Sequence, residues 1–407
     1  MSFEVPHGEK PVTVSLPACD ITVATAAGGT PIDVRKTADD AVANPHGVEL
    51  TERVNPDDSV AIVVTDVTRA TPDDVLLDVL LGELDRAGID RKNVTVVIGL
   101  GLHRPMTDEE IDAAFGDLAD LAVNHNPEQT VEVGTVDSCA IELFEPVAEA
   151  DVVCSTGMVE PHQYAGFSGG AKTAVIGAGG ESQIRYTHGP GLLGQEGVRL
   201  GRIDDNPFRE FLDRAGDSAC VEFCLNVTKG SNGIIDVSAG DPRAVVSELA
   251  NTALEALAVD IDGKYDAVVA GVGAPKDANL YQSTRAATYI ILGATNPLRQ
   301  GGRVVVPARL HEGAGEGTGE QRFYEWLSDA TDPDSLFERM KSGYDPGAQR
   351  AFVVARALRD YDVWITDSEQ PAVVEDCLMQ TAPTVEDAIE PGSDVLVVPD
   401  SLGTLLR

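Results

Sequence analysis

The chain has 407 residues, 43% of them apolar and 24% charged, which is enough for two or three domains and a sizeable core. Its 67 acidic and 30 basic residues give a net charge of −37, and phosphate backbones repel such a surface, so we expect no nucleic-acid partner. No apolar run approaches the ~20 residues of a membrane span, and the start of the chain lacks the basic-then-apolar pattern of a signal peptide, so we expect a cytoplasmic protein with no membrane partner.

The carboxylates are spread evenly along the chain, whereas acidic tails usually come in blocks. Aspartate supplies 39 of the 67 acidic residues, and lysine supplies only 8 of the 30 basic ones. We interpret this bias as typical of a high-salt cytoplasm, where strong screening makes the self-repulsion tolerable. The six cysteines form no CxxC pair, which argues against a cysteine zinc site.

Strand-length apolar runs alternate with helical patterns through the first 258 residues. The spacing of Thr107 and Glu110 is typical of a capping box at the start of a helix. We predict strands at 59–65, 93–98 and 151–154, and helices at 73–87, 107–114 and 242–258.

A second alternating series begins near Lys264. We predict strands at 265–271, 302–307, 362–366 and 394–398, and helices at 283–292, 319–328 and 347–358. Such alternation indicates an α/β fold with mainly parallel sheets whose faces are covered by helices. Residues 260–264 are a plausible joint, so we expect an N-terminal α/β domain at 1–262 and a C-terminal α/β domain at 263–407, with the active site in a cleft between them.

Unusual polar residues follow three predicted strands of the first domain. Asp66 and Arg69 follow the strand at 59–65, His103 follows the strand at 93–98, and His162 follows the strand at 151–154. Taken alone, Asp66 could cap a turn and each histidine could be an ordinary loop residue. Because ligands bind beyond the carboxyl ends of parallel strands, their shared position favours a functional group of residues.

The densest motif is the glycine-rich segment 160–180, which includes Gly166, Ser168, Gly169, Gly170 and Lys172. It is similar to a phosphate-binding loop, but Ala171 stands where that loop requires glycine, and no apolar strand leads directly into it, which argues against nucleotide hydrolysis. Lys172, near a helix start and partly desolvated, is either a nucleophile or covalent tether, or a simple cation for a phosphate.

His188 lies in a glycine-rich context but is a poor metal site by itself, because transition metals usually require three or four donors. If a metal is present, a bound cofactor has to supply the other ligands. In the second domain, Gln282 and Arg285 are three apart and share a helix face. A carboxylate held between Arg285 and Arg69 is a sensible arrangement, although Arg285 could equally be a solvated surface residue.

These motifs resemble those of the nickel-dependent lactate racemase family. The resemblance runs from the Asp66-x-x-Arg69 motif to Asn279-Leu-Tyr281-Gln282 and covers most of the chain. It is most specific in Gly-Leu-His103-Arg-Pro, in Pro-His162 followed by Gly-Phe-Ser-Gly-Gly-x-Lys172, and in His188.

The resemblance implies an isomerase that interconverts the enantiomers of lactate or another 2-hydroxy acid. It implies nickel in a nickel pincer nucleotide, the pyridinium-3-thioamide-5-thiocarboxylic acid mononucleotide, covalently attached at Lys172, with His188 as the protein's ligand to the metal. His103 and His162 would be the two acid/bases that exchange the hydroxyl proton while the α-hydrogen moves as hydride to and from the cofactor. Cofactor-synthesis proteins would be required for maturation.

The resemblance also implies roles around the substrate. Arg69 would bind its carboxylate, Asp66 would orient the cofactor or Arg69, and the second domain would contribute Tyr281 and Gln282. Arg285 departs from the family pattern, which usually has lysine there, and arginine is longer, forked and unable to donate a proton. The substrate could therefore be lactate or a different 2-hydroxy acid.

Two other functional classes remain open at this stage. A non-catalytic nucleotide- or phosphate-binding protein would bind a nucleotide tightly without nickel. A hydrolase with His103, His162 and His188 as a direct zinc site would bind metal even after loss of Lys172.

Overall fold

The computed structural model describes residues 2–101, 103–344 and 347–407, and it forms two compact units. The first unit comprises Gly28–His188 and Arg202–Ala256, and the second comprises Met1–Ala27, Gly189–Gly201 and Leu257–Arg407. The chain passes from the first unit to the second between Ala256 and Leu257, and the N-terminal residues and the segment 189–201 also belong to the second unit. The domain boundary at 262/263 stays a prediction.

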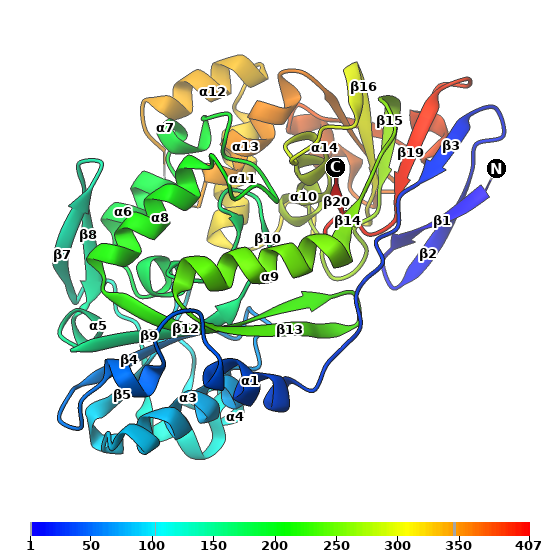
Figure 1. Cartoon of the computed structure of the whole chain (residues 1–407). Helices are drawn as coiled ribbons and strands as arrows, with labels where there is room; N and C mark the ends of the chain where they lie inside the picture. The colour runs from blue at the N-terminus through cyan, green and yellow to red at the C-terminus, as the bar shows by residue number, and fades with distance from the viewer. Residues whose placement is uncertain (1, 102, 345–346) are drawn as a thin grey trace. The chain divides into compact units, whose positions relative to one another are not determined.

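The first unit is built on a six-stranded sheet in the order β13-β12-β9-β4-β5-β6 (Figure 1). All neighbours are parallel except β12 and β13, which pair antiparallel. The strands are β4 (Val60–Thr65), β5 (Val94–Gly99), β6 (Ala122–Asn124), β9 (Val152–Met158), β12 (Val221–Gly230) and β13 (Gly233–Gly240). The three strands predicted for this domain are confirmed as β4, β5 and β9.

Helices cover both faces of this sheet, as a buried parallel sheet requires (Figure 1). Helix α3 packs Leu76, Leu80 and Leu84, which are four residues apart, into the core beneath Ile62 and Val64 of β4. The helices of this unit are α1 (Val34–Ala43), α2 (Leu50–Arg53), α3 (Asp73–Ala87), α4 (Asp108–Phe115), α5 (Glu145–Ala148), α6 (Glu181–Thr187), α8 (Pro207–Ser218) and α9 (Pro242–Leu257). The predicted capping box is present, because Thr107 accepts from the Glu110 amide while the Glu110 carboxylate accepts from the Thr107 amide.

The strand order reverses between β4 and β9, which makes this the topological switch point of the sheet. The β4–β9 ladder ends at Val63 and Ser155. By contrast, β4 stays paired with β5 up to Thr65, and β9 stays paired with β12 up to Met158. The two halves of the sheet therefore separate at their carboxyl ends, which is where ligands bind in open α/β sheets.

Small hairpins complete the first unit. Strands β7 (Thr130–Val136) and β8 (Cys139–Phe144) pair antiparallel, and so do the two-residue strands β10 (Pro161–His162) and β11 (Gly166–Phe167). A single π-helical turn, η3 (Thr173–Gly177), follows Lys172 and contacts β4, β5 and β9. The sequence predicted neither these hairpins nor the β12–β13 pair.

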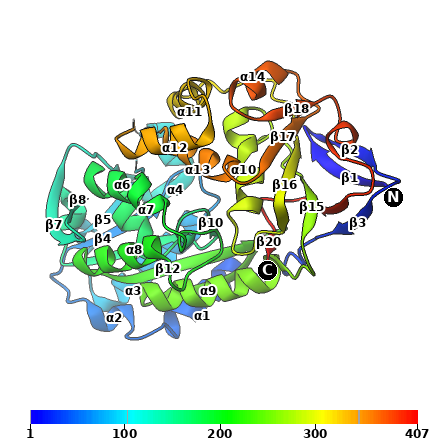
Figure 2. The same cartoon turned by 90° about the horizontal axis from the view of Figure 1, so that it is seen from above.

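The second unit contains a six-stranded sheet that is parallel throughout, in the order β18-β17-β16-β15-β19-β3 (Figure 2). The strands are β3 (Asp20–Val23), β15 (Tyr265–Ala270), β16 (Leu298–Pro307), β17 (Asp362–Thr366), β18 (Gln380–Ala382) and β19 (Asp394–Val398). The helices are α7 (Pro190–Leu193), α10 (Leu280–Ile291), α11 (Thr318–Ser328), α12 (Pro333–Lys341), α13 (Gln349–Leu358) and α14 (Pro371–Asp376). A two-stranded parallel pair, β14 (Ala258–Val259) with β20 (Leu405–Leu406), lies outside this sheet.

The N-terminal hairpin, β1 (Ser2–His7) with β2 (Lys10–Ser15), packs on this second sheet and closes its switch point between β15 and β19. Gly271 follows β15 and Pro399 follows β19, so the two mark the carboxyl ends of the strands on either side of the switch point. A Cβ at Gly271 would lie 2.1 Å from the Pro399 carbonyl oxygen and 2.9 Å from Pro6 of β1, so the hairpin packs directly against this point. The Gly8 amide donates to the carboxylate of Asp277 at 2.5 Å. The hairpin thus fills the position that a ligand would take in this sheet. No helix in the described part of the chain is long and apolar enough to cross a membrane.

Candidate active site

The first unit brings Asp66 and His103 together at the carboxyl edge of its sheet. The Nδ1 atom of His103 lies 2.6 Å from Oδ2 of Asp66, and Asp66 also accepts from the Thr68 amide at 3.1 Å. Burial alone would raise the pKa of Asp66, but the hydrogen bonds from His103 and Thr68 outweigh it and lower that pKa. Asp66 is therefore ionised and accepts a hydrogen bond from Nδ1 of His103, so the neutral form of this ring has its lone pair on Nε2. The motif around His103 includes Leu102, which lies outside the described residues.

His162 has the opposite hydrogen-bonding arrangement. Its Nδ1 accepts from the backbone amides of Tyr164 at 3.3 Å and Ala165 at 3.1 Å, so the neutral ring carries its proton on Nε2. Burial lowers its pKa well below the usual value, and the positive charges of Lys172 and Arg69 lower it further. His162 therefore presents an uncharged N–H donor, whereas His103 presents a lone pair.

Gly166 makes the turn after His162 possible. It pairs with His162 across the β10–β11 hairpin at φ +75°, and a Cβ there would lie 1.8 Å from the Arg202 carbonyl oxygen. A side chain at this position would collide with the main chain and strain the backbone. Only glycine fits, so the hairpin that positions His162 depends on it.

The rest of the glycine-rich segment is held by neighbouring strands. The Ser168 hydroxyl donates to the Met158 carbonyl at 2.6 Å, and the Gly170 amide donates to Oδ1 of Asn226 at 2.7 Å. Gly169 and Gly170 have φ of +80° and +62°, and a Cβ at either would press against a valine side chain at 2.5 to 2.7 Å. This hairpin followed by a π-helical turn differs from the strand-to-helix turn of a phosphate-binding loop.

Lys172 lies in this segment, two residues after Gly170, and is partly buried. Burial lowers its pKa to about 7, and the positive charges of Arg69 and Arg209 contribute to the shift. A large fraction of the amine is therefore uncharged at neutral pH, which is the form that reacts as a nucleophile.

His188 caps the end of α6 and is oriented by its Nδ1 atom. This atom lies 3.1 Å from the Ile184 carbonyl oxygen and 3.0 Å from the Thr187 hydroxyl. Because a carbonyl only accepts, Nδ1 carries the proton and the Nε2 lone pair remains free for a metal. Burial lowers the pKa of His188 to about 4, so the ring is neutral at pH 7.

Two aromatic side chains place His162 and His188 in one cluster. The Tyr164 ring makes edge-to-face contacts with both histidines, with centroids 5.6 Å apart in each case. The Phe208 ring of α8 also packs on both, at 6.2 Å from His162 and 5.6 Å from His188. The sequence predicted neither aromatic residue, because Phe208 comes from a separate part of the chain and the motif at 160–180 gave no role to Tyr164.

Further charged groups surround this cluster. Glu160 accepts ion pairs from Arg69 at 3.5 Å and from Lys229 at 3.0 Å. Arg209 is buried and donates to the Phe167 carbonyl at 3.1 Å. Glu160 lies two residues after the end of β9, and this position could have identified it as a site residue. Arg209 and Lys229 lie on later elements, and no local pattern identifies them.

In the second unit, Tyr281, Gln282 and Arg285 lie on α10, which begins three residues earlier than predicted because Asn279 is its N-cap. The buried Arg350 donates to the Tyr281 carbonyl at 3.0 Å and fixes this first turn. The Nε atom of Arg285 is buried and has no hydrogen-bond partner among the described residues. A carboxylate shared between Arg285 and Arg69 involves both units and stays a prediction.

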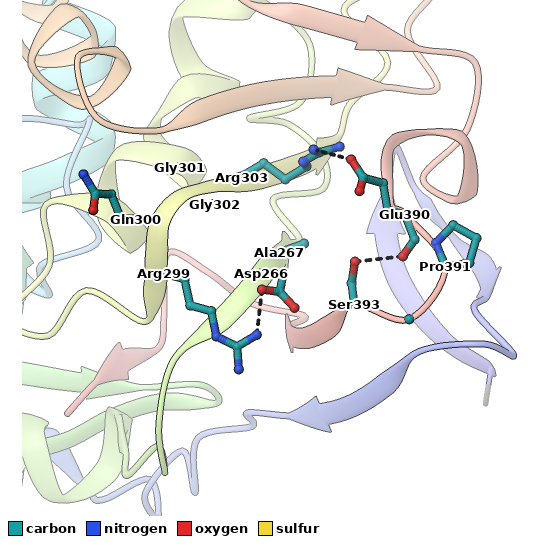
Figure 3. Close-up of a pocket in the computed structure, with 11 residues that line it drawn as sticks. Asp266, Ala267, Arg299, Gln300, Gly301, Gly302, Arg303, Glu390, Pro391 and Ser393 are labelled. Carbon is teal, nitrogen blue, oxygen red and sulfur yellow. Dashed lines mark hydrogen bonds and ion pairs between the residues drawn. The ribbon is translucent and has the colours of Figure 1, made fainter.

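A pocket of about 310 Å³ lies at the amino-terminal edge of the second sheet, where β15 and β16 begin (Figure 3). Its charged groups already pair with one another, Arg299 with Asp266 at 2.6 Å and Arg303 with Glu390 at 3.0 Å. Ligands of α/β sheets bind at the carboxyl edge, so this pocket is a weaker candidate than the site in the first unit.

The residues of the first unit fit a tethered, anionic, metal-bearing cofactor. Lys172 offers an uncharged amine, His188 offers one free nitrogen, and the backbone can approach closely at Gly169 and Gly170. Two buried donors beside the glycines, Nδ2 of Asn226 and Nε of Arg209, have no partner within the described chain. No group of three or more histidine, cysteine, aspartate or glutamate side chains among the described residues could hold a metal directly.

Comparison with models of known protein families shows which family the chain belongs to. Residues 7–201 match the lactate racemase N-terminal domain, and residues 262–404 match the lactate racemase C-terminal domain. The chain belongs to the lactate racemase family. The family inferred from the motifs is thereby confirmed, as is the two-domain α/β class with mainly parallel sheets.

The relatives of this lactate racemase family member span its full length. The lactate racemase of Thermoanaerobacterium thermosaccharolyticum is 27% identical over 441 residues, covering 100% of this chain and 99% of the relative. That of Lactiplantibacillus plantarum is 26% identical over 445 residues, with complete coverage of both chains.

Solved structures support the same relationship. The lactate racemase apoprotein of T. thermosaccharolyticum has a TM-score of 0.87 at 25% identity, and both chains are fully covered. A Thermotoga maritima protein has a TM-score of 0.66 at 17% identity, covering 93% of this chain and all of that one, which shows a shared fold alone. The family's enzymes are isomerases, in agreement with the class expected from the motifs.

Proposed function

We propose that this protein is a lactate racemase that works with a nickel pincer nucleotide attached to Lys172. The observation that carries the proposal is the arrangement of Lys172 and His188 around the same cluster as His162. An uncharged amine and a free imidazole nitrogen are the two groups that such a cofactor requires from the protein. When bound, the cofactor would supply the acceptor and donor of the hydride at the substrate's C2 atom.

The two catalytic histidines begin with complementary protonation. His103 can accept the substrate's hydroxyl proton at Nε2, and ionised Asp66 stabilises the resulting imidazolium. The neutral His162 ring can hold the oxygen of the planar 2-oxo acid through a hydrogen bond from its Nε2–H, and it would act as the proton donor only after taking up a second proton, because loss of Nε2–H from the neutral ring would leave an imidazolate. The proton balance between the rings is then restored through solvent, to which His103 is half exposed.

Substrate binding requires a cation for the carboxylate. Arg69 supplies it, and its partner Glu160 limits its movement. We propose that Tyr281, Gln282 and Arg285 are the substrate-binding residues contributed by the second unit. Maturation would require cofactor-synthesis proteins.

The first test is the mass and metal content of protein purified from its native host in high salt. We expect a nucleotide adduct on the Lys172 peptide, nickel in the sample, and conversion of one lactate enantiomer into the racemate. Lys172→Ala should lose adduct, nickel and activity, whereas the control Lys92→Ala, which changes an exposed lysine, should keep all three. An unmodified Lys172 without nickel in active cells would overturn the proposal in favour of a nucleotide-binding protein.

The roles of the histidines are tested separately. His103→Asn and His162→Asn should each abolish racemisation with the adduct still attached. His46→Asn is a matched control because His46 also contacts a carboxylate, that of Glu248 at 2.8 Å, outside the cluster. Full turnover in either active-site variant would contradict the two-base scheme. Activity on another 2-hydroxy acid but not on lactate would reassign the substrate and leave the chemistry in place.

A further inference from the structure

Asp73 is a buried carboxylate that the proposed chemistry does not use. It is the first residue of α3, it is 8% exposed, and it lies at the switch point between β4 and β9. Its preceding residue, Pro72, makes no side-chain cap for the helix. A buried carboxylate is costly unless hydrogen bonds satisfy it, so its partners indicate what it does.

The partners of Asp73 come from both separated strands. Its Oδ2 accepts from the hydroxyl of Thr65 and from the Thr65 amide at 3.3 Å, at the end of β4. Its Oδ1 accepts from the hydroxyl of Thr156 in β9. The β4–β9 ladder has already ended at Val63 and Ser155, so the carboxylate bridges the strands where backbone pairing stops.

The two threonines lie on the strands that lead to the proposed catalytic groups. Thr65 directly precedes Asp66, which holds His103, and Thr156 lies in the strand that leads to Glu160 and His162. A change of spacing between Thr65 and Thr156 would therefore move one histidine relative to the other.

We propose that Asp73 is a positioning residue that fixes the distance between the two halves of the catalytic site by bridging Thr65 and Thr156. This inference rests on the proposed racemase function. Racemisation needs both histidines aligned on one substrate oxygen, and misplacement by about 1 Å can cost on the order of 100-fold in rate.

The burial of Asp73 supports its assignment as a positioning residue, because a buried carboxylate carries a free-energy cost. Burial raises the pKa of Asp73 to about 7, although the hydrogen bonds from Thr156 and Thr65 oppose the shift. The charge of the neighbouring Asp74 raises that pKa further. A carboxylate used only to begin a helix could be placed at the surface without this cost.

The experiment measures racemisation by the cofactor-loaded enzyme in four single variants and one double variant. Thr156→Val removes one hydroxyl and keeps the shape of the side chain, so we expect kcat to fall about 10-fold with KM nearly unchanged. Asp73→Ala should reduce kcat further, and Asp73→Asn should restore part of the loss. Asp74→Asn is the matched control, because it removes a charge from the next, exposed position of the same helix, and it should behave as wild type.

Coupling between the variants separates positioning from general destabilisation. Because Asp73→Ala and Thr156→Val break the same bridge, the double variant should be no slower than Asp73→Ala alone. If the double variant lost the product of the two single-variant reductions in kcat, the proposal would be overturned. The same would follow if Thr156→Val and Asp73→Ala each had the kcat of the control Asp74→Asn.

A spectroscopic measurement distinguishes failure of this proposal from failure of the proposed function. In apoprotein with ¹⁵N-labelled histidine, the ring resonances of His103 and His162 should shift in Asp73→Ala and stay unchanged in Asp74→Asn. An inactive, nickel-free wild type would reject the racemase function, and this measurement would still test the bridge. Unchanged ring resonances in Asp73→Ala would reject the bridge whatever the activity.

Discussion

At the scale of single residues, the site is defined by contrasts between groups of the same type. His103 donates from Nδ1 to a carboxylate, whereas Nδ1 of His162 accepts from two backbone amides. Two identical side chains thus differ at Nε2, where neutral His103 can accept a hydrogen bond and neutral His162 can donate one. Hydrogen-bond partners, more than residue type, determine these roles.

Asp66 should be essential because it carries the charge that stabilises protonated His103. We expect Asp66→Asn to lower kcat by roughly 10² to 10⁴-fold, since asparagine keeps the size of the side chain but loses the charge and can hold the wrong tautomer. The measurement is the steady-state rate of lactate racemisation, with the Lys172 adduct quantified by mass spectrometry. A normal rate with full adduct would show that His103 needs no carboxylate.

The amine of Lys172 should react at a lower pH than ordinary lysines. Its pKa of about 7 means that the uncharged form dominates above neutral pH, whereas exposed lysines remain charged up to about pH 10. In cofactor-free protein, the rate of acetylation at Lys172, followed by peptide mass spectrometry against pH, should reach half its maximum near pH 7. A midpoint like that of Lys92 would contradict this.

The raised pKa of Asp73 has a consequence for stability. The folded protein binds this proton more tightly than the unfolded chain does, so the contribution to the free energy of unfolding is full below about pH 4 and is lost as pH rises through 7. Asp73→Asn should therefore flatten the pH dependence of urea unfolding between pH 5 and about 8 relative to Asp74→Asn. Parallel profiles for the two variants would count against a buried, titrating carboxyl.

At the scale of elements, the strands were predictable and the site's framework was not. Continuous apolar runs identified β4, β5 and β9, and the residues after them included Asp66, His103 and His162. Phe208 and Asn226 could not be predicted in the same way, because they reach the glycine segment from α8 and β12 and match no local pattern. Periodicity identifies elements, but tertiary packing brings distant elements together.

Two glycines of the first unit should respond to alanine in opposite directions. Gly166→Ala would place a Cβ 1.8 Å from a carbonyl oxygen at φ +75°, so we expect a loss of more than about 2 kcal/mol in the free energy of unfolding. Gly82 is exposed within α3, and a Cβ there would meet no neighbouring atom within 4 Å, so Gly82→Ala should add roughly 0.5 to 1 kcal/mol. Urea unfolding of both variants measures this, and effects of the same sign would contradict the local geometry.

At the scale of the whole molecule, charge sets the conditions under which the fold is stable. A net charge of −37 destabilises any compact state through self-repulsion, and dissolved salt screens it. We propose that the protein works in the high-salt cytoplasm expected from its composition. Exposed ion pairs contribute little to stability, so they do not offset this repulsion.

Salt should therefore stabilise the protein strongly. We expect the thermal midpoint to rise as KCl increases from about 0.1 M to about 2 M, because the Debye length falls from roughly 10 Å to below 3 Å. The measurement is the unfolding midpoint by circular dichroism in each salt concentration. A midpoint that stays constant or falls would show that self-repulsion is not a controlling term.

The N-terminal hairpin and strand β3 give the chain a particular order of assembly. Strand β3 leaves the ribosome long before its partner, because Asp20 pairs with Asp394, which is synthesised 374 residues later. Every strand of the first sheet, by contrast, lies between Val60 and Gly240, so that sheet can form while synthesis continues. During translation the hairpin has no completed sheet to pack on. The nascent chain must therefore keep an exposed β-strand edge from aggregating, and its dense negative charge provides repulsion between chains during that interval.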